Sequence, residues 1–235
     1  MYQKEFYVFN QSKPLPATIR NYQETDFTEL IRIQKECFPP PFPEELWWNT
    51  AQLKNHITQF PDGALCIEVE GKLVGSMTAL LVDFHVNDPN HTWEEITDNG
   101  YINTHNRNGN TLYVVDICVS PHFRNFGLGK WLMLSMYEIV VQKKLDRLLG
   151  GSRMPGFHRY QKNMTAESYV HSVVNGDIKD PVITFLLRCG RTPVKVVPNY
   201  LQDEESCHYG VLMEWKNPFI QKNRKEATIN AISSH

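Results

Sequence analysis

Apolar residues recur with helical spacing in several stretches of this chain. Phe27, Leu30 and Ile33 form one such stripe, which predicts a helix over 25–38. Pro43 suits the first turn of the helix that follows it. The further helices are predicted over 43–60, 129–144, 165–174 and 181–190.

Short runs rich in β-branched and aromatic residues separate these helices. The runs 64–70 and 72–84 meet at Glu70-Gly71, a pair typical of a two-residue hairpin turn. The run 112–119 is apolar at nearly every position, which indicates a strand buried on both faces. The alternation of strands and helices predicts an α/β fold with a mixed sheet. The predicted strands cover 17–22, 64–70, 72–84, 112–119, 147–152, 193–197 and 208–215.

Two long polar segments, 85–110 and 153–180, interrupt this order. Loops of this length in a compact domain are functional lids or disordered segments. Aromatic residues such as Trp93 and Tyr169 favour ordered lids here. The predicted divisions of the chain are an N-terminal extension over 1–16, one domain over 17–216 and a polar tail over 217–235.

Composition narrows the class of protein. The 235 residues are 41% apolar and 21% charged, which is ordinary for a globular domain, and the net charge of -2 gives no general attraction to nucleic acid or an acidic membrane. The start lacks the apolar core of a secretion signal, and no apolar run approaches the ~20 residues that span a bilayer. Five scattered cysteines without a CxxC or HExxH motif suit reduced thiols. A cytoplasmic protein without metal, membrane or nucleic-acid partner is expected.

The stretch "SPHFRNFGLGKWL" carries glycines and cations directly after an apolar strand. A Walker loop would need a glycine at Arg124 and a hydroxyl residue at Trp131, and a dinucleotide fingerprint would need a glycine at Leu132. What remains is a strand, a turn with Gly127 and Gly129, and a helix. Amides in such a turn can point toward one site, and the helix N-terminus favours a pyrophosphate.

The stretch "ICVSPHFRNFGLGKWLM" resembles motif A of the GNAT superfamily of acyl-CoA-dependent N-acyltransferases, whose pattern is Arg/Gln-x-x-Gly-x-Gly/Ala. The preceding strand, the "VSP" entry and the element order agree with that family over about 17–216. The second long segment also resembles GNAT domains fused to carbon-nitrogen hydrolases. The resemblance implies six or seven strands with helices on both faces, and a splay between strands four and five.

The resemblance also implies a place for acetyl-CoA, or another acyl-CoA, as co-substrate. The pantetheine arm would follow the end of the strand 112–119, and the pyrophosphate would meet the amides of 125–130. An amine would be the acceptor, and a homodimer is left open. The implied binding residues are Ile117, Cys118, Val119, Arg124, Asn125, Phe126, Gly127, Leu128, Gly129 and Lys130.

Direct attack of an amine on the thioester needs a base, an oxyanion donor and an acid for the leaving thiolate. The resemblance places the oxyanion donor in the backbone near Val119. Asp116 lies in the apolar run "YVVDICV", so it is expected to be either the base or amine anchor, or a buried hydrogen-bonded structural residue. His158 and Tyr160, in "SRMPGFHRY" after a predicted strand, are further catalytic candidates at the substrate mouth.

The usual acid of the family is missing. Many members carry a tyrosine four residues before a Gly-Phe pair, but Leu186 stands at that position and Gly190 is followed by arginine. Other tyrosines could replace it, namely Tyr160, Tyr169 and Tyr200, or the thiolate could leave without an acid. The predicted activity is acetyl transfer to a primary amine, and the alternative is a catalytically silent CoA-binding or regulatory module. The acceptor is left open between a small amine, an amino acid, a polyamine, an antibiotic and a protein terminus.

Overall fold

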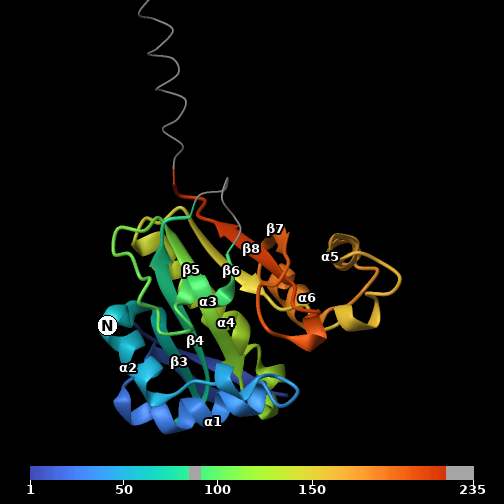
Figure 1. Ribbon diagram of the computed structural model, residues 1–235. Coiled ribbons are helices and arrows are strands. Elements are labelled where there is room, and N and C mark those ends of the chain that lie inside the picture. The colour runs from blue at the N-terminus through green and yellow to red at the C-terminus, as the bar shows by residue number, and fades with distance from the viewer. Residues whose placement is uncertain (85–90, 221–235) are drawn as a thin grey trace, which may run out of the picture.

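An eight-stranded mixed sheet forms the centre of the protein (Figure 1). The structure, a computed structural model, describes residues 1–84 and 91–220. The strand order is β1-β2-β3-β4-β5-β6-β8-β7, and all neighbours are antiparallel except β5 and β6. The strands are β1 (Gln3–Asn10), β2 (Lys13–Asn21), β3 (Ala64–Val69), β4 (Lys72–Val82), β5 (Thr111–Val119), β6 (Arg147–Ser152), β7 (Thr192–Val197) and β8 (Gly210–Lys216).

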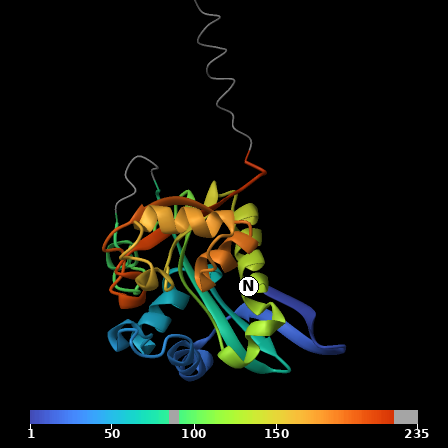
Figure 2. The ribbon, with the colours of Figure 1, turned by 90° about the vertical axis from the view of Figure 1, so that its right-hand side faces the viewer.

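Helices cover both faces of this sheet, as the sequence predicts. Figure 2 shows α1 and α2 on one side of the central strands and α4 on the other. Among the helices of the described residues, none combines the length and the apolar character needed to cross a bilayer. The helices are α1 (Phe27–Cys37), α2 (Thr50–Gln59), α3 (Trp93–Thr97), α4 (Leu128–Gln142), α5 (Ala166–Asn175) and α6 (Pro181–Arg188).

The prediction of six or seven strands was too low, because the segment 1–16 joins the sheet. Strand β1 pairs with β2 along its whole length, and β2 begins at Lys13 rather than at residue 17. Phe6 on β1 packs against Trp131 of α4, with ring centroids 4.3 Å apart. The exposed side of β1 carries the aromatic residues Tyr7 and Phe9, so apolar and polar residues do not alternate clearly along this strand.

The helix predicted over 43–60 is also shorter than expected. Pro43 precedes a 3₁₀ turn at Glu44–Leu46, and α2 begins only at Thr50. The reason is a capping box: Oδ1 of Asn49 accepts the Gln52 N–H at 2.9 Å, and the Gln52 side chain accepts the Asn49 N–H at 2.9 Å. A cap of this kind fixes the helix start more strongly than the apolar spacing does.

The second inserted segment contains α5, which Thr165 caps by accepting the Ser168 N–H at 3.2 Å. Asp180 then ties this segment to α6. Its side chain caps α6 at two backbone N–H groups and also accepts the Gly156 N–H at 3.0 Å and the Tyr169 hydroxyl at 2.8 Å. The segment is therefore a packed part of the domain.

Strands β5 and β6 diverge. They are the fourth and fifth of the predicted strands, because β1 was not among those, so their divergence confirms the predicted splay. They pair only over Thr111–Tyr113 and Arg147–Leu149. Beyond these residues β5 continues beside β4 as far as Val119, while β6 continues beside β8. The register of β5 against β4 shifts just before Asp116, where a bulge bends the strand. The gap opened in this way holds the candidate site.

Candidate active site

Two cavities meet where β5 and β6 separate. The larger, here called the cleft, has a volume of about 780 Å³ and lies between the start of α4, the end of β5 and the segment 153–180. The smaller, called the inner pocket, has a volume of about 150 Å³ and lies against β5, β6 and α3. The two cavities are adjacent, because five residues line both of them: Phe38, Ile117, Arg153, Val182 and Phe185.

Positive charge lines the cleft. Arg153, one of its cations, is paired with Asp203 at 2.7 Å and with Glu205 at 2.9 Å. The other cations of the cleft form no salt bridge with any residue that the structure describes. Such uncompensated charge in a concave site favours an anionic ligand. These cations are Arg124, Lys130, Arg159, Lys179 and Arg188.

Helix α4 begins on the wall of the cleft. Gly127, directly before it, has a φ of +71°, a left-handed conformation that glycine adopts without a Cβ clash. The carbonyl of Gly127 accepts the N–H groups of Lys130 and Trp131 at 3.0 and 3.2 Å, which closes the first turn. Amides at a helix start lack partners within the helix and carry the positive end of its dipole. The glycine turn thus directs a helix N-terminus at the cleft.

Most of the predicted CoA-binding residues line the cleft: Ile117, Cys118, Val119, Arg124, Gly127, Gly129 and Lys130. The side chains of the remaining three lie elsewhere. Asn125 is exposed, Phe126 packs against Phe123 with ring centroids 5.7 Å apart, and Leu128 is buried in the core. Contact of these three residues with a ligand would use their backbone.

Asp116 lines the inner pocket beside the bulge of β5. Its Oδ2 atom is sealed from solvent and has no hydrogen-bond partner among the described residues. Burial raises the pKa of this carboxyl to about 7, while the Ile117 N–H and the Trp48 indole favour its charged form. A fully hydrogen-bonded structural aspartate would not leave this oxygen unpaired. The position therefore fits a proton acceptor that faces a ligand.

Tryptophans form part of the inner pocket. The rings of Trp48 and Trp93 lie 6.4 Å apart by centroid. Trp93 donates its indole N–H to the carbonyl of Val115 at 3.1 Å, while the indole N–H of Trp48 is buried without a partner. Trp93 belongs to the predicted insertion 85–110, of which residues 85–90 lie outside the described residues. The described part of this insertion is thus a wall of the pocket.

Of the two further catalytic candidates, Tyr160 lines the cleft and His158 lines neither cavity. The Nδ1 atom of His158 lies 2.8 Å from the carbonyl of Pro155 and 3.2 Å from that of Glu205. These contacts fix the turn after β6. Direct contact with substrate is therefore open to Tyr160 but not to His158 in this geometry.

The other two tyrosines considered as acids are hydrogen-bonded within the fold. Tyr169 donates its hydroxyl to Asp180 and is fully buried. Tyr200 lines the inner pocket, and its hydroxyl lies 2.8 Å from that of Tyr113. Leu186, at the position of the family's usual tyrosine, also lines the inner pocket. No described residue therefore replaces that tyrosine on the same turn of α6.

All five cysteines are free, as the sequence predicts, and three of them line the cleft: Cys37, Cys118 and Cys189. Burial raises the pKa of the Cys189 thiol. The Sγ atom of Cys37 lies 3.1 Å from the carbonyl of Val119. A hydrogen bond with the Cys118 thiol lowers the pKa of the Cys37 thiol, and the nearby Arg124 adds to this effect, while burial opposes it. Cys118 has a raised pKa from the same hydrogen bond and from burial. Cys37, with a lowered pKa, is thus the most reactive of the thiols that line the cleft.

Sequence reasoning missed Arg191 as a site residue. It stands in "LLRCGRTPVKVV", between a helix and a strand, where its burial leaves no signal in the local pattern. In the structure it is only 3% exposed and lines the inner pocket. Its Nη2 atom donates to the carbonyl oxygens of Gly150 and Met213.

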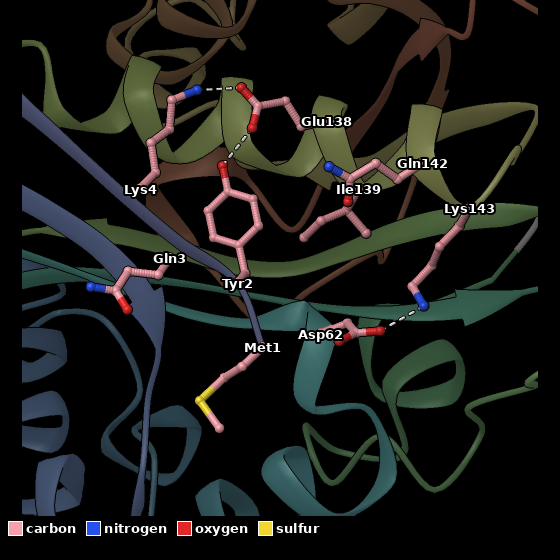
Figure 3. Close-up of a pocket in the computed structure, with 9 residues that line it drawn as sticks. All are labelled: Met1, Tyr2, Gln3, Lys4, Asp62, Glu138, Ile139, Gln142 and Lys143. Carbon is pink, nitrogen blue, oxygen red and sulfur yellow. Dashed lines mark hydrogen bonds and ion pairs between the residues drawn. The ribbon is translucent and has the colours of Figure 1, made fainter.

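A third cavity, of about 550 Å³, lies between the N-terminus and α4, away from the splay (Figure 3). Figure 3 shows Tyr2 and Lys4 pointing at Glu138, with the Tyr2 hydroxyl 2.7 Å from that carboxylate. On the other side Lys143 pairs with Asp62 at 2.6 Å. These paired charges attach β1 to the body of the protein, so the cavity does not compete with the splay as a reactive site.

Comparison with known proteins agrees with this geometry. The acetyltransferase (GNAT) family model matches residues 27–159. The chain is 57% identical to "Uncharacterized N-acetyltransferase YkwB" of Bacillus subtilis (strain 168), over 93% of this chain and 97% of that protein. It is 39% identical to "Probable hydrolase YhcX" of the same organism, over 85% of this chain but only 38% of that longer protein. The latter match agrees with the resemblance to fused GNAT domains.

Solved structures show the same fold. The loading GNATL domain of CurA from Lyngbya majuscula matches with a TM-score of 0.74 at 22% identity, over 86% of this chain and 98% of that domain. The GphF GNAT-like decarboxylase in complex with isobutyryl-CoA matches with a TM-score of 0.72 at 22% identity, over 85% and 98%. The chain therefore belongs to the GNAT acetyltransferase family and is an acyltransferase.

Proposed function

We propose that this protein transfers an acyl group, acetyl in the simplest case, from acyl-CoA to a primary amine. The proposal rests above all on the two adjacent cavities in the splay, because unpaired cations line the cleft and a carboxylate oxygen without a hydrogen-bond partner lines the inner pocket. A silent CoA-binding module would need only the cleft. It gives no reason for the carboxylate of Asp116 to face the inner pocket with a pKa of about 7.

The residues of the cleft fit a coenzyme A moiety. Its phosphates match the N-terminus of α4 and the cations Arg124 and Lys130 beside it. The apolar pantetheine arm matches the end of β5, where Ile117 and Val119 line the cleft. The solved GphF relative, which has the same fold, binds isobutyryl-CoA. Bound acyl-CoA would supply the thioester as the acyl donor.

Asp116 is proposed as the base. An alkyl ammonium has an ordinary pKa near 10, so it must lose a proton before it attacks a carbonyl carbon. A carboxyl with a pKa of about 7 is about half ionised at pH 7, and its ionised form can accept that proton.

The backbone of β5 is proposed to bind the oxyanion. Beyond Tyr113 its edge is no longer paired with β6, so N–H groups on that side are not used by a neighbouring strand. Tyr160, which lines the cleft, is proposed as the acid that protonates the thiolate. The step is a direct displacement in which the C–N bond forms and the C–S bond breaks. The ammonium gives one proton to Asp116 before the attack, and the second proton lost by the nitrogen replaces the one that Tyr160 gives to the thiolate.

The test is acyl transfer from acetyl-CoA to a panel of primary amines, measured as released CoA and as the acetylated amine by mass spectrometry. We expect transfer with the native protein, a loss of roughly 100-fold with Asp116→Asn, and a smaller loss with Tyr160→Phe. His158→Gln is the matched control, because His158 lines neither cavity, and it should retain transfer. Stabilisation by CoA without transfer to any amine of the panel would instead support the silent module.

A further inference from the structure

The inner pocket contains a cation, Arg191, that forms no salt bridge with the residues that the structure describes. Arg191 is 3% exposed, and no acidic side chain among the described residues pairs with it. Its Nη2 atom is used by two backbone carbonyl groups, but Nε has no hydrogen-bond partner. Burying a guanidinium without an anion is unfavourable, so such a group is normally matched by a partner of opposite charge.

The other charged groups of the inner pocket do not supply that partner. Arg153 is a second cation there, and its own charge is balanced by Asp203 and Glu205. Asp116 is the acidic residue among the described walls, and it forms no salt bridge with Arg191. Burial lowers the pKa of the Arg191 guanidinium to about 10. The groups that oppose this effect are Tyr137, Tyr113 and other side chains that are neutral at neutral pH, and no carboxylate is among them. The guanidinium is therefore charged at neutral pH and available to an anion.

The position of Arg191 relative to Asp116 limits the size of such an anion. The Nη2 atom of Arg191 lies 3.2 Å from the point where a Cβ on Gly150 would stand, and Val114 lies 3.0 Å from that same point. Arg191 is therefore beside Val114, two residues before Asp116 on β5. Two residues of strand correspond to ~7 Å. An amine at Asp116 and an anion at Arg191 can thus belong to one small molecule.

The chemistry of the walls identifies the group. The Nε–H group of Arg191, which has no partner among the described residues, can donate a hydrogen bond to a carboxylate, and the carboxylate would balance the charge of the guanidinium. Aromatic and aliphatic side chains, including Phe42, Trp93 and Leu201, complete the inner pocket and suit an apolar body. We propose that Arg191 binds a substrate carboxylate, so that the acceptor of this enzyme is an amino acid with an apolar side chain or the acyl group itself ends in a carboxylate. This inference rests on the proposed acyl transfer to an amine.

The two sources of the carboxylate are separated by two arms of one experiment. In the first arm, acetyl-CoA is offered with leucine and 3-methylbutylamine, and with phenylalanine and 2-phenylethylamine, which differ only in the carboxylate. In the second arm, 3-methylbutylamine is offered with succinyl-CoA and butyryl-CoA. The readout is the ratio of kcat/KM with and without the carboxylate, which does not depend on the folded fraction of the preparation.

For the native protein we expect a ratio of roughly 10 to 100 in one arm, the range of a hydrogen bond to a charged group. Arg191→Met should bring that ratio close to one, and Arg191→Lys should restore part of it because the charge remains. Arg147→Met is the matched control, since Arg147 pairs with Glu214 on the same part of the sheet and lines neither cavity. Its ratio should equal the native one.

Three results would overturn the inference in distinguishable ways. Transfer to the amines with a native ratio near one in both arms would show that the pocket does not recognise a carboxylate. A high ratio that survives Arg191→Met in protein that CoA still stabilises would assign the recognition to another residue. Absence of transfer in every combination would instead remove the proposed function, and this inference with it.

Discussion

Replacing Asp116 by asparagine should make the protein more stable and less active at neutral pH. Asparagine keeps the shape of the side chain, and its Oδ1 atom can still accept the Ile117 N–H that favours the charged carboxyl. It removes the negative charge that burial disfavours. Since Oδ2 of Asp116 has no partner, no hydrogen bond of the folded protein is lost with it.

The size of the effect follows from the pKa. A rise from the ordinary value of 3.8 to about 7 means that the folded protein holds this proton more tightly than the unfolded chain does. Stability therefore falls as the pH rises from about 4 to about 7, and the loss stays constant above that range. Its full size is about 4 kcal/mol, and water entering the pocket would reduce it to about 2 kcal/mol.

The assay compares urea unfolding of the native protein and of Asp116→Asn at pH 4, 6 and 8. The difference in unfolding free energy should be below about 1 kcal/mol at pH 4 and about 2 to 4 kcal/mol in favour of the variant at pH 8. Asp26→Asn is a control of opposite sign. Burial raises the pKa of Asp26, but the hydrogen bonds from Arg20 and the Gln23 N–H, together with the charge of Arg20, outweigh burial and lower it. That variant should lose stability above pH 4.

Activity gives the second half of the test. A plot of log kcat/KM against pH should lose one unit of slope near pH 7 in the native protein, where Asp116 becomes ionised, and should lack this break in Asp116→Asn. The reasoning is refuted if the variant is destabilised at pH 8 with unchanged turnover, because the carboxylate would then be a structural group. Equal stability and an unchanged pH profile would refute both roles.

Three further predictions concern the cleft. CoA at ~100 times its dissociation constant should stabilise the protein by roughly 2.7 kcal/mol, seen as a higher melting temperature, and no shift at millimolar CoA would contradict the assignment of the cleft. A Cβ at Gly129 would stand 3.1 Å from the ring of Phe185, which lines both cavities, so Gly129→Val should weaken CoA binding at least tenfold in calorimetry. A Cβ at Gly127 would meet no atom within 4 Å, but the φ of +71° at this position is unfavourable for alanine, so Gly127→Ala should instead lower stability by about 1 kcal/mol. Iodoacetamide should modify Cys37 before Cys207, which is also partly exposed but whose pKa is raised by burial, and CoA should slow the modification of Cys37. Peptide mass spectrometry that shows Cys207 modified first, or no protection by CoA, would contradict this prediction.

The glycine turn and the cations of the cleft were predictable because their signal is local. A glycine that must take a left-handed φ, a helix that starts directly after it and cations beside it all lie within a few residues of one another. Such a turn has the same requirements in any context. The splay was predicted through the family resemblance, and the short pairing of β5 with β6 confirms it.

The strand count and one helix start were wrong for different reasons. Strand β1 exposes one side to solvent and buries Val8 but few other residues, so its alternation is too weak to predict a strand from sequence alone. The helix predicted over 43–60 begins at Thr50 because side-chain capping at Asn49 prevails over the favourable position of Pro43. Both errors arise where a few specific contacts outweigh the average pattern.

The inner pocket could not be predicted because its walls come from distant parts of the chain. Trp48, Asp116 and Arg191 lie on separate elements, and only the folded sheet brings them to one space. The sequence offers Asp116 as a buried carboxylate but offers no partner for it. It offers Arg191 only as the residue that follows Gly190, where the family pattern has phenylalanine.

The net charge of the chain and the charge of the cleft differ in this protein. The net charge of -2 gives no reason to expect nonspecific attraction to polyanions, because that attraction depends on the field of the whole surface. A single polyphosphate ligand responds instead to the unpaired cations within one cleft, which include Arg124, Lys130 and Arg159. Acidic residues elsewhere balance the total without entering that cleft, and Glu205, which does line it, is held by Arg153. The distribution of ion pairs, which the fold determines, therefore decides which anions this protein can bind.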